Sequence, residues 1–243
     1  MKLKYLFSGL LSLASASAFA CTGLIAAPGA TADSSVLITY AADSHTLYGE
    51  LYFKPSANHE EGAMRKVYEW DTGKYLGSIP EVNHTYTTIG NMNEHGLAIT
   101  ESTWGGREEL AGSGIIDYGS LIYITLERAK TAREAIKVMT DLVKDYGYAS
   151  GGESFTIADT KEVWIMELIG KGKDDKGAVW VARRVPDDCI SGHANHSRIH
   201  KVYQCGTDLL YKHRPSQHKN RLIRFSRLVQ NVYIRFFRHN TPS

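Results

Sequence analysis

The fold class is decided by residues 155–182, which read FTIADTKEVWIMELIGKGKDDKGAVWVA. Three runs rich in β-branched and aromatic residues alternate there with polar turn sequences. The first turn is Asp159-Thr160-Lys161, and the second is the Gly-, Lys- and Asp-rich loop at 170–177. This alternation predicts a meander of three strands, at Phe155–Ala158, Val163–Glu167 and Val179–Ala182.

Two helices are expected before this meander. Residues 119–129 (GSLIYITLERA) predict the first helix, and Thr131 with Glu134 forms a capping box that opens a second, which ends at Gly147. Two more strands are expected upstream, at Val36–Tyr40 and Gly96–Thr100. Strands, then a helix pair, then strands indicate an α+β protein in which helices cover sheets, not a βαβ repeat.

Residues 1–20 have the pattern of an export signal. Lys2 and Lys4 precede an apolar run, and Ala18-Phe19-Ala20 supplies the small-x-small pattern at which a signal peptidase cuts. No later apolar run approaches the roughly 20 residues that span a bilayer. We therefore expect export to the periplasm or the extracellular space, with no integral membrane segment after cleavage.

Cleavage after Ala20 would make Cys21 the first residue of the mature chain. Such a cysteine carries a thiol beside a free α-amine, whose ordinary pKa is roughly 7.7–8.0. A nucleophile with its own base attached needs no histidine partner. Two alternatives stay open: a lipidated cysteine that only anchors the chain, or a structural one. Because a lipobox prefers Leu where Ala18 stands and a small residue where Phe19 stands, the sequence favours the nucleophile.

Composition fits one globular domain with a sizeable core. The chain has 243 residues, 43% of them hydrophobic, and a net charge of +2, which excludes no class of partner. Its three cysteines are an odd number. Cys189 and Cys205 could pair in an oxidising compartment or stay unlinked, and the sequence does not choose between these alternatives.

Residues 200–243 differ in composition from the rest of the chain. They hold nine Lys and Arg residues against one acidic residue, Asp208. A basic, aromatic segment can bind anionic lipid or nucleic acid. We favour another interpretation, a non-native reading frame or a disordered tail, and expect no nucleic-acid partner. The domain is accordingly placed at residues 21–199, and is expected to be incomplete.

A series of short motifs follows Cys21 in order. These are ATADSS at 30–35, ADS at 42–44, NMNEHGLAI at 91–99, ESTWGGRE at 101–108, GESF at 152–155 and GHAN at 192–195. Together they resemble the C69 dipeptidase family of N-terminal nucleophile cysteine hydrolases over residues 21–199. The MNEHGL portion is also similar to acylases that hydrolyse conjugated bile salts and penicillin V.

The resemblance implies a four-layer αββα sandwich and the hydrolysis of dipeptides, with no metal and no cofactor. The Cys21 thiolate would attack the scissile carbonyl, its α-amine would take the proton, and a thioester would form and hydrolyse. The resemblance assigns Asn93, and by motif position Asn195, to the oxyanion. It assigns Asp43 to a hydrogen bond that holds the nucleophile, and Arg198 to substrate binding or to a positive charge near the thiol.

Each of these residues has a plainer interpretation. Asn93 could only cap its turn, Asp43 could be a solvated loop carboxylate, and Asn195 and Arg198 could be structural. The sequence also departs from the superfamily at Tyr40, because an arginine commonly stands three residues before the acidic residue and would lower the thiol pKa.

Alternative functions therefore stay open: an amidase that acts on acyl-amides by the same mechanism, a lipidated non-enzymatic module, or an inactive fragment. A spacing that could suggest zinc, at His193, His196 and His200, lacks the HExxH pattern. The sequence does not predict an oligomeric state.

Overall fold

The computed structural model describes residues 21–43, 49–199, 209–212 and 237–238. The predicted export signal and most of the basic tail lie outside the described residues. None of the described helices has the length and the apolar character needed to cross a membrane.

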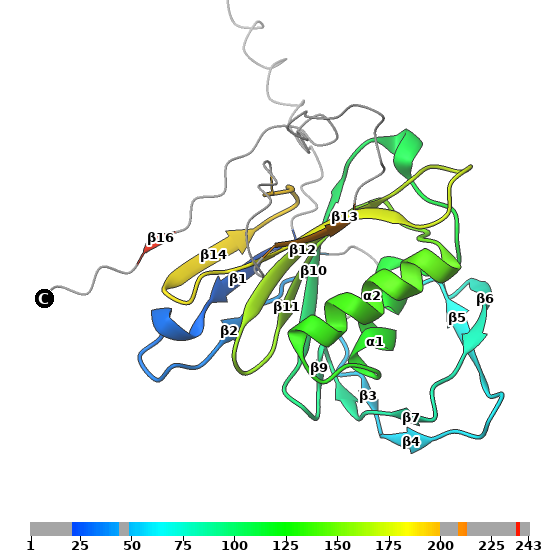
Figure 1. Ribbon diagram of the computed structural model, residues 1–243, viewed down its shortest axis with the longest axis horizontal. Coiled ribbons are helices and arrows are strands. Elements are labelled where there is room, and N and C mark those ends of the chain that lie inside the picture. The colour runs from blue at the N-terminus through cyan, green and yellow to red at the C-terminus, as the bar shows by residue number, and fades with distance from the viewer. Residues whose placement is uncertain (1–20, 44–48, 200–208, 213–236, 239–243) are drawn as a thin grey trace, which may run out of the picture.

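A large antiparallel sheet of eight strands forms the centre of the fold (Figure 1). The predicted meander is confirmed as β11, β12 and β13, which pair in sequence order. β10 pairs with β11 on the other side of the meander. In spatial order the strands are β15 (Leu209–Lys212), β13 (Ala178–Arg184), β12 (Val163–Gly170), β11 (Gly152–Ala158), β10 (Ala98–Gly105), β9 (Met92–Asn93), β8 (Thr88–Ile89) and β3 (Phe53–Lys54).

A second sheet has four strands, with β1 between β14 and β2. Its members in spatial order are β16 (Phe237–Arg238), β14 (Cys189–His193), β1 (Gly23–Ala26) and β2 (Leu37–Ile38). β2 confirms the predicted strand at Val36–Tyr40, shortened to two residues. β15 and β16 come from the basic tail, so strand pairing continues beyond the predicted boundary at residue 199.

The two predicted helices are confirmed as α1 (Tyr118–Leu126) and α2 (Ala132–Tyr146). The Thr131 hydroxyl accepts a 3.3 Å hydrogen bond from the Glu134 backbone N–H, as the capping box predicts. Gly147 ends α2 with φ +77°, a conformation that glycine adopts without strain. α1 ends three residues earlier than the predicted helix.

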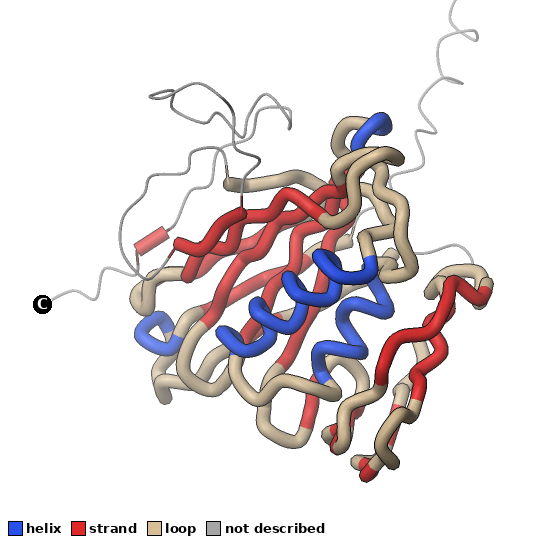
Figure 2. The backbone as a smooth tube through the Cα atoms, turned by 45° about the vertical axis from the view of Figure 1, so that its right-hand side comes forward, coloured by secondary structure: helices blue, strands red, loops and turns tan. Residues whose placement is uncertain are grey.

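Alternation along the strands builds two apolar cores, because neighbouring strand residues point to opposite faces. On β12, Trp164 and Met166 face the helices, and Val163 and Ile165 face the four-stranded sheet. The helices thus cover one face of the large sheet and the small sheet covers the other (Figures 1 and 2). This architecture is α+β, as predicted; the complete four-layer sandwich stays a prediction.

Residues 49–89 form an excursion of short paired strands that the sequence did not predict. They contain β4 (Ala57–Asn58) with β7 (His84–Thr85), and β5 (Met64–Tyr68) with β6 (Tyr75–Pro80). Two single-turn 3₁₀ helices complete the described fold, η1 (Pro28–Ala30) and η2 (Glu108–Leu110).

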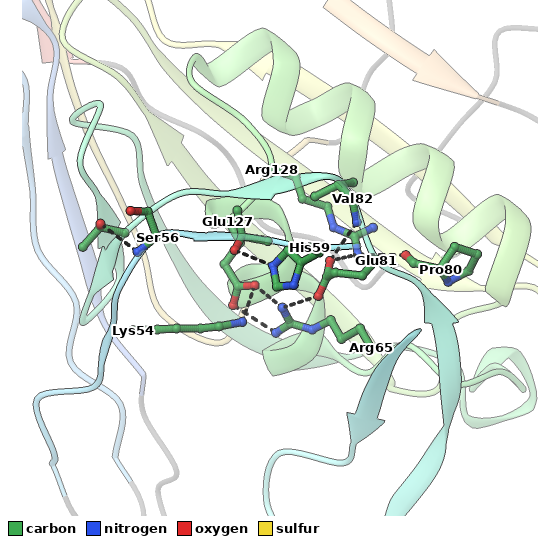
Figure 3. Close-up of polar contacts among 11 residues, drawn as sticks. Lys54, Ser56, His59, Arg65, Pro80, Glu81, Val82, Glu127 and Arg128 are labelled. Atoms are coloured by element: carbon green, nitrogen blue, oxygen red, sulfur yellow. Dashed lines mark hydrogen bonds and ion pairs between the residues drawn. The ribbon is translucent and has the colours of Figure 1, made fainter. Parts of the chain in front are cut away.

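A buried ion-pair network joins this excursion to the end of α1 (Figure 3). Glu127, 2% exposed, accepts from Lys54 Nζ at 2.7 Å and from Arg65. Arg128 donates to Glu81 at 2.7 Å. Because the carboxylates are buried with their cations, these contacts fix the excursion against the helix.

Candidate active site

Cys21 lies directly before β1 and is half-buried. Its neighbour Thr22 exchanges two 2.9 Å backbone hydrogen bonds with Ala41, so the chain at 40–43 runs beside it. From the large sheet, the Ser102 hydroxyl donates to the Cys21 carbonyl oxygen at 3.4 Å. The thiol therefore sits where the edge of the small sheet meets β10.

Ser102 also connects Cys21 to Asn195. The Asn195 backbone N–H donates to Ser102 Oγ at 2.8 Å, and its side-chain Nδ2 donates to the Thr103 carbonyl at 2.5 Å. Asn195 has φ +45°, a left-handed conformation in which Asn is enriched and which recurs at functional sites. The structure thus joins two of the predicted site residues through one hydroxyl.

Asp43 acts on Cys21 through two opposing effects. Burial raises the pKa of the Cys21 thiol, and the negative charge of Glu101 raises it further. A hydrogen bond from the Asp43 backbone lowers it, while the charges of Glu153 and of the exposed Asp43 carboxylate raise it. The Asp43 contact with the nucleophile is therefore made by the main chain, where the sequence predicts a role for the residue.

Asn93 is buried at the end of α1. Its Nδ2 donates to the carbonyls of Leu126 and Ala129, both at 2.7 Å, and its Oδ1 accepts from two backbone N–H groups of its own turn. Both amide hydrogens are used, so this side chain has none to offer an oxyanion. These contacts fit the turn-capping interpretation, and they explain why α1 ends at Leu126.

Arg198 lies with Glu167 and His193. Its backbone N–H donates to Glu167 Oε1, and that of Ile199 donates to the same oxygen at 3.1 Å. Burial raises the pKa of Glu167 to about 7, against the hydrogen bonds and positive charge of this segment. The Arg198 charge acts on Glu167 and His193.

Two buried carboxyls that the sequence analysis did not single out lie close to the nucleophile. Glu101 on β10 accepts a 2.6 Å hydrogen bond from the Tyr40 hydroxyl, and Glu153 on β11 accepts one of 2.9 Å from Thr103. Both residues stand in motifs that carried the family resemblance. Strand alternation could have paired them, since Glu101 and Thr103 share a face of β10 and Thr103 lies opposite Glu153.

A cavity of about 280 Å³ opens beside this cluster. Tyr40 and Ala42, from the segment next to Cys21, line it together with Tyr118 at the start of α1. Its far wall is aromatic and includes Tyr52, Trp70 and Tyr123, with the rings of Trp70 and Tyr123 stacked at 4.6 Å. Within the described part of the chain, no three His, Cys, Asp or Glu side chains are grouped as metal ligands.

A half-buried thiol, a buried carboxyl pair and a small aromatic cavity are the components of a hydrolase site that takes a small ligand. The sequence model of Peptidase family C69 matches residues 20–208, most of the chain, and the chain belongs to this family. The match begins one residue before Cys21 and extends nine residues beyond the predicted domain boundary.

Curated relatives are named as dipeptidases. The probable dipeptidase of Latilactobacillus sakei is 29% identical over 205 residues, which are 75% of this chain and 41% of the relative. The probable dipeptidase of Salmonella dublin is 27% identical over 222 residues (81% and 47%), and probable dipeptidase A of Streptococcus pyogenes serotype M1 is 26% identical over 218 residues (79% and 44%). The chain spans less than half the length of these relatives.

Proposed function

We propose that this protein is a cysteine-type peptidase that hydrolyses dipeptides, with Cys21 as an N-terminal nucleophile. The observation that carries the proposal is the position of Cys21, at the head of β1 and hydrogen-bonded through its carbonyl to Ser102 of the large sheet. Membership of family C69 and the names of the relatives support a peptide-bond hydrolase.

The reaction has two steps. The Cys21 α-amine takes the thiol proton as sulfur bonds to the scissile carbonyl carbon, the C–N bond then breaks, and the proton passes to the leaving amine. Water next adds to the thioester with the α-amine as base, and the C–S bond breaks to release the carboxylic acid. Because burial and Glu101 raise the thiol pKa, proton transfer within one residue is the activation that this site needs most.

For the oxyanion we propose Asn195. Its Nδ2 uses one hydrogen on the Thr103 carbonyl and has a second, whereas Asn93 has both engaged. Asn195→Ala should then lower kcat by about 10²–10³ with a small change in KM. Asn93→Ala should chiefly lower the free energy of unfolding. An Asn195→Ala enzyme with wild-type kcat would contradict the assignment.

Export is part of the proposal, because the α-amine exists only once the bond between Ala20 and Cys21 is cut. Intact mass and N-terminal sequencing of the protein from its native host test this directly. A free, unmodified Cys21 supports the mechanism. A lipid-bearing Cys21, or cleavage elsewhere, supports the alternative of an anchored module.

The four-layer sandwich is proposed for the complete domain. The outer face of the small sheet exposes Leu24, Leu37 and Ile190 at 58%, 55% and 44%. Strand register places all three on the face opposite Ile25, which is buried against the large sheet. A further helical layer would cover this apolar face. A structure of a full-length relative with this face bare would contradict it.

The decisive experiment uses the mature chain beginning at Cys21. Cys21→Ser should keep little dipeptide hydrolysis and Cys21→Ala none, and turnover by the Ala variant would refute the mechanism. A matched control adds one alanine before Cys21, which keeps the thiol and displaces the amine, and should also abolish turnover. Turnover of acyl-amides in place of dipeptides would favour the amidase alternative.

A further inference from the structure

We propose that Glu101 and Glu153 form a subsite for the free α-ammonium group of the dipeptide whose carbonyl is attacked by Cys21. This inference rests on the proposed function and adds to it the group of the substrate that is recognised. It also separates a dipeptidase from an acylase, because an acylated amine carries no charge.

Strand register brings the two carboxyls together. Thr103 lies directly opposite Glu153, and Glu101 precedes Thr103 by two residues on the same face of β10. The Thr103 hydroxyl lies 2.9 Å from Glu153 Oε1 and 3.5 Å from Glu101 Oε2. The two carboxyls are thus held as a pair around one hydroxyl.

The pair is buried and lacks a cation. Glu101 is 3% exposed and Glu153 is 1% exposed. None of the ion pairs among the described residues involves either carboxyl. Burial, and then the charge of Glu101, raise the pKa of Glu153 well above its ordinary value, so the pair keeps one proton and one negative charge.

One oxygen of the pair also lacks a donor. Glu153 Oε2 is buried without a hydrogen-bond partner in the part of the chain that the structure describes. A buried charge and an unsatisfied acceptor are costly unless a partner arrives. An ammonium group supplies both a positive charge and three N–H donors, and so matches what the pair lacks.

The spacing within a dipeptide fits this position. Its α-nitrogen is two bonds from the scissile carbonyl carbon, about 2.5 Å away by standard backbone dimensions. The ammonium subsite must therefore lie within a few ångströms of the nucleophile. The charges of both Glu101 and Glu153 reach the Cys21 thiol, as this requires.

The adjacent cavity completes the subsite. The Tyr40 hydroxyl lines the cavity wall and donates to Glu101 at 2.6 Å, so this wall joins the carboxyl pair. The aromatic rings of Tyr52, Trp70 and Tyr123 form an apolar surface for a substrate side chain. A volume of about 280 Å³ suits a ligand of dipeptide size.

The test compares a dipeptide with its N-acetylated analogue in the mature chain. We expect wild-type kcat/KM to favour the free amine by more than about 100-fold, as for a site built to pair a buried charge. Glu101→Gln and Glu153→Gln should each reduce this ratio at least tenfold, mainly through KM of the free dipeptide. Glu167→Gln, which alters a buried carboxyl elsewhere on the large sheet, should keep the ratio.

A binding measurement separates the two proposals. Calorimetry on the Cys21→Ala chain should detect the free dipeptide and not the acetylated one, and should lose that preference when Glu153→Gln is added. If no variant and no wild-type chain turns over a dipeptide, the proposed function fails, whereas the calorimetry still decides the subsite. Turnover or binding that does not distinguish the two ligands, or a preference unchanged by both Gln variants, overturns the subsite.

The Cys21 α-amine is the other cation that could reach this pair. In that case both Gln variants would move the acid limb of the kcat/KM pH profile and leave the ratio of the two substrates unchanged. This result would overturn the inference, because an amine held in its charged form by a carboxylate serves the nucleophile and not substrate recognition.

Discussion

The Tyr40 hydroxyl donates a 2.6 Å hydrogen bond to Oε1 of the buried Glu101, beside the Cys21 thiol. The family resemblance would have favoured arginine where Tyr40 stands. Burial and the charge of Glu101 raise the pKa of the tyrosine, so it stays a neutral donor. The nucleophile therefore lies next to a negative carboxyl that no positive side chain at this position offsets.

Tyr40→Arg should lower the pKa of the Cys21 thiol by about 1–3 units, because a positive charge would stand beside both the carboxylate and the thiol. The pH dependence of iodoacetamide alkylation measures this. Tyr40→Phe is the matched control, which removes the hydrogen bond without adding charge and should not lower the thiol pKa. An equal response of both variants would show that Glu101 does not control the thiol.

Ser102→Ala should reduce turnover through loss of position, since Ser102 bridges the Cys21 carbonyl and the Asn195 backbone. We expect kcat to fall about tenfold with KM nearly unchanged, and stability to fall by about 1 kcal/mol. Ser154→Ala is the matched control: Ser154 lies opposite Ser102 on β11, is equally buried, and its hydroxyl has no partner among the described residues. Equal kcat losses in both variants would argue against a positioning role.

Strong local signals were sufficient for the centre of the fold. The meander, the capping box at Thr131 and the stop at Gly147 follow from alternation and capping chemistry within short windows, and all are confirmed. The strands at 49–89 are two to six residues long and have little period to detect. Their pairing depends on the ion pairs with α1, which no local pattern contains.

The candidate site shows the same division. Cys21 follows from a local cleavage pattern, whereas the partnership of Glu101 with Glu153 depends on strand register, which joins residues more than 50 positions apart. Asn93 illustrates the converse. Its motif predicts an oxyanion donor, but the end of α1 uses both of its amide hydrogens, because helix carbonyls there need donors.

Glu127→Gln should lower the free energy of unfolding by about 3–5 kcal/mol, because it leaves Lys54 and Arg65 at a buried site without their anion (Figure 3). Urea unfolding measures the change. Asp141→Asn is the control, since it removes an exposed pair with Lys137 and should cost under about 0.5 kcal/mol. Similar losses in the two variants would mean that the network adds little beyond a surface pair.

His193 should make the protein less stable in acid. It is 2% exposed, its Nε2 lies 2.7 Å from Thr156 Oγ1, and burial, then the charge of Arg198, lower its pKa to about 4. Since the ordinary value is 6.5, the unfolded chain binds more protons between these limits, so this contribution to stability is lost as pH falls from about 6.5 towards 4. The loss from pH 7 to pH 5 is about 2 kcal/mol.

Glu167 should oppose this trend. Its pKa rises from 4.5 to about 7 on folding, so the native state binds more protons between these values, and its contribution falls as pH rises through them. From pH 7 to pH 5 it adds about 2 kcal/mol, nearly cancelling His193. Urea unfolding at the two pH values should then show opposite tilts: His193→Gln gains relative stability at pH 5, and Glu167→Gln loses it. Tilts of the same sign would mean that one of the two buried groups does not titrate as its environment requires.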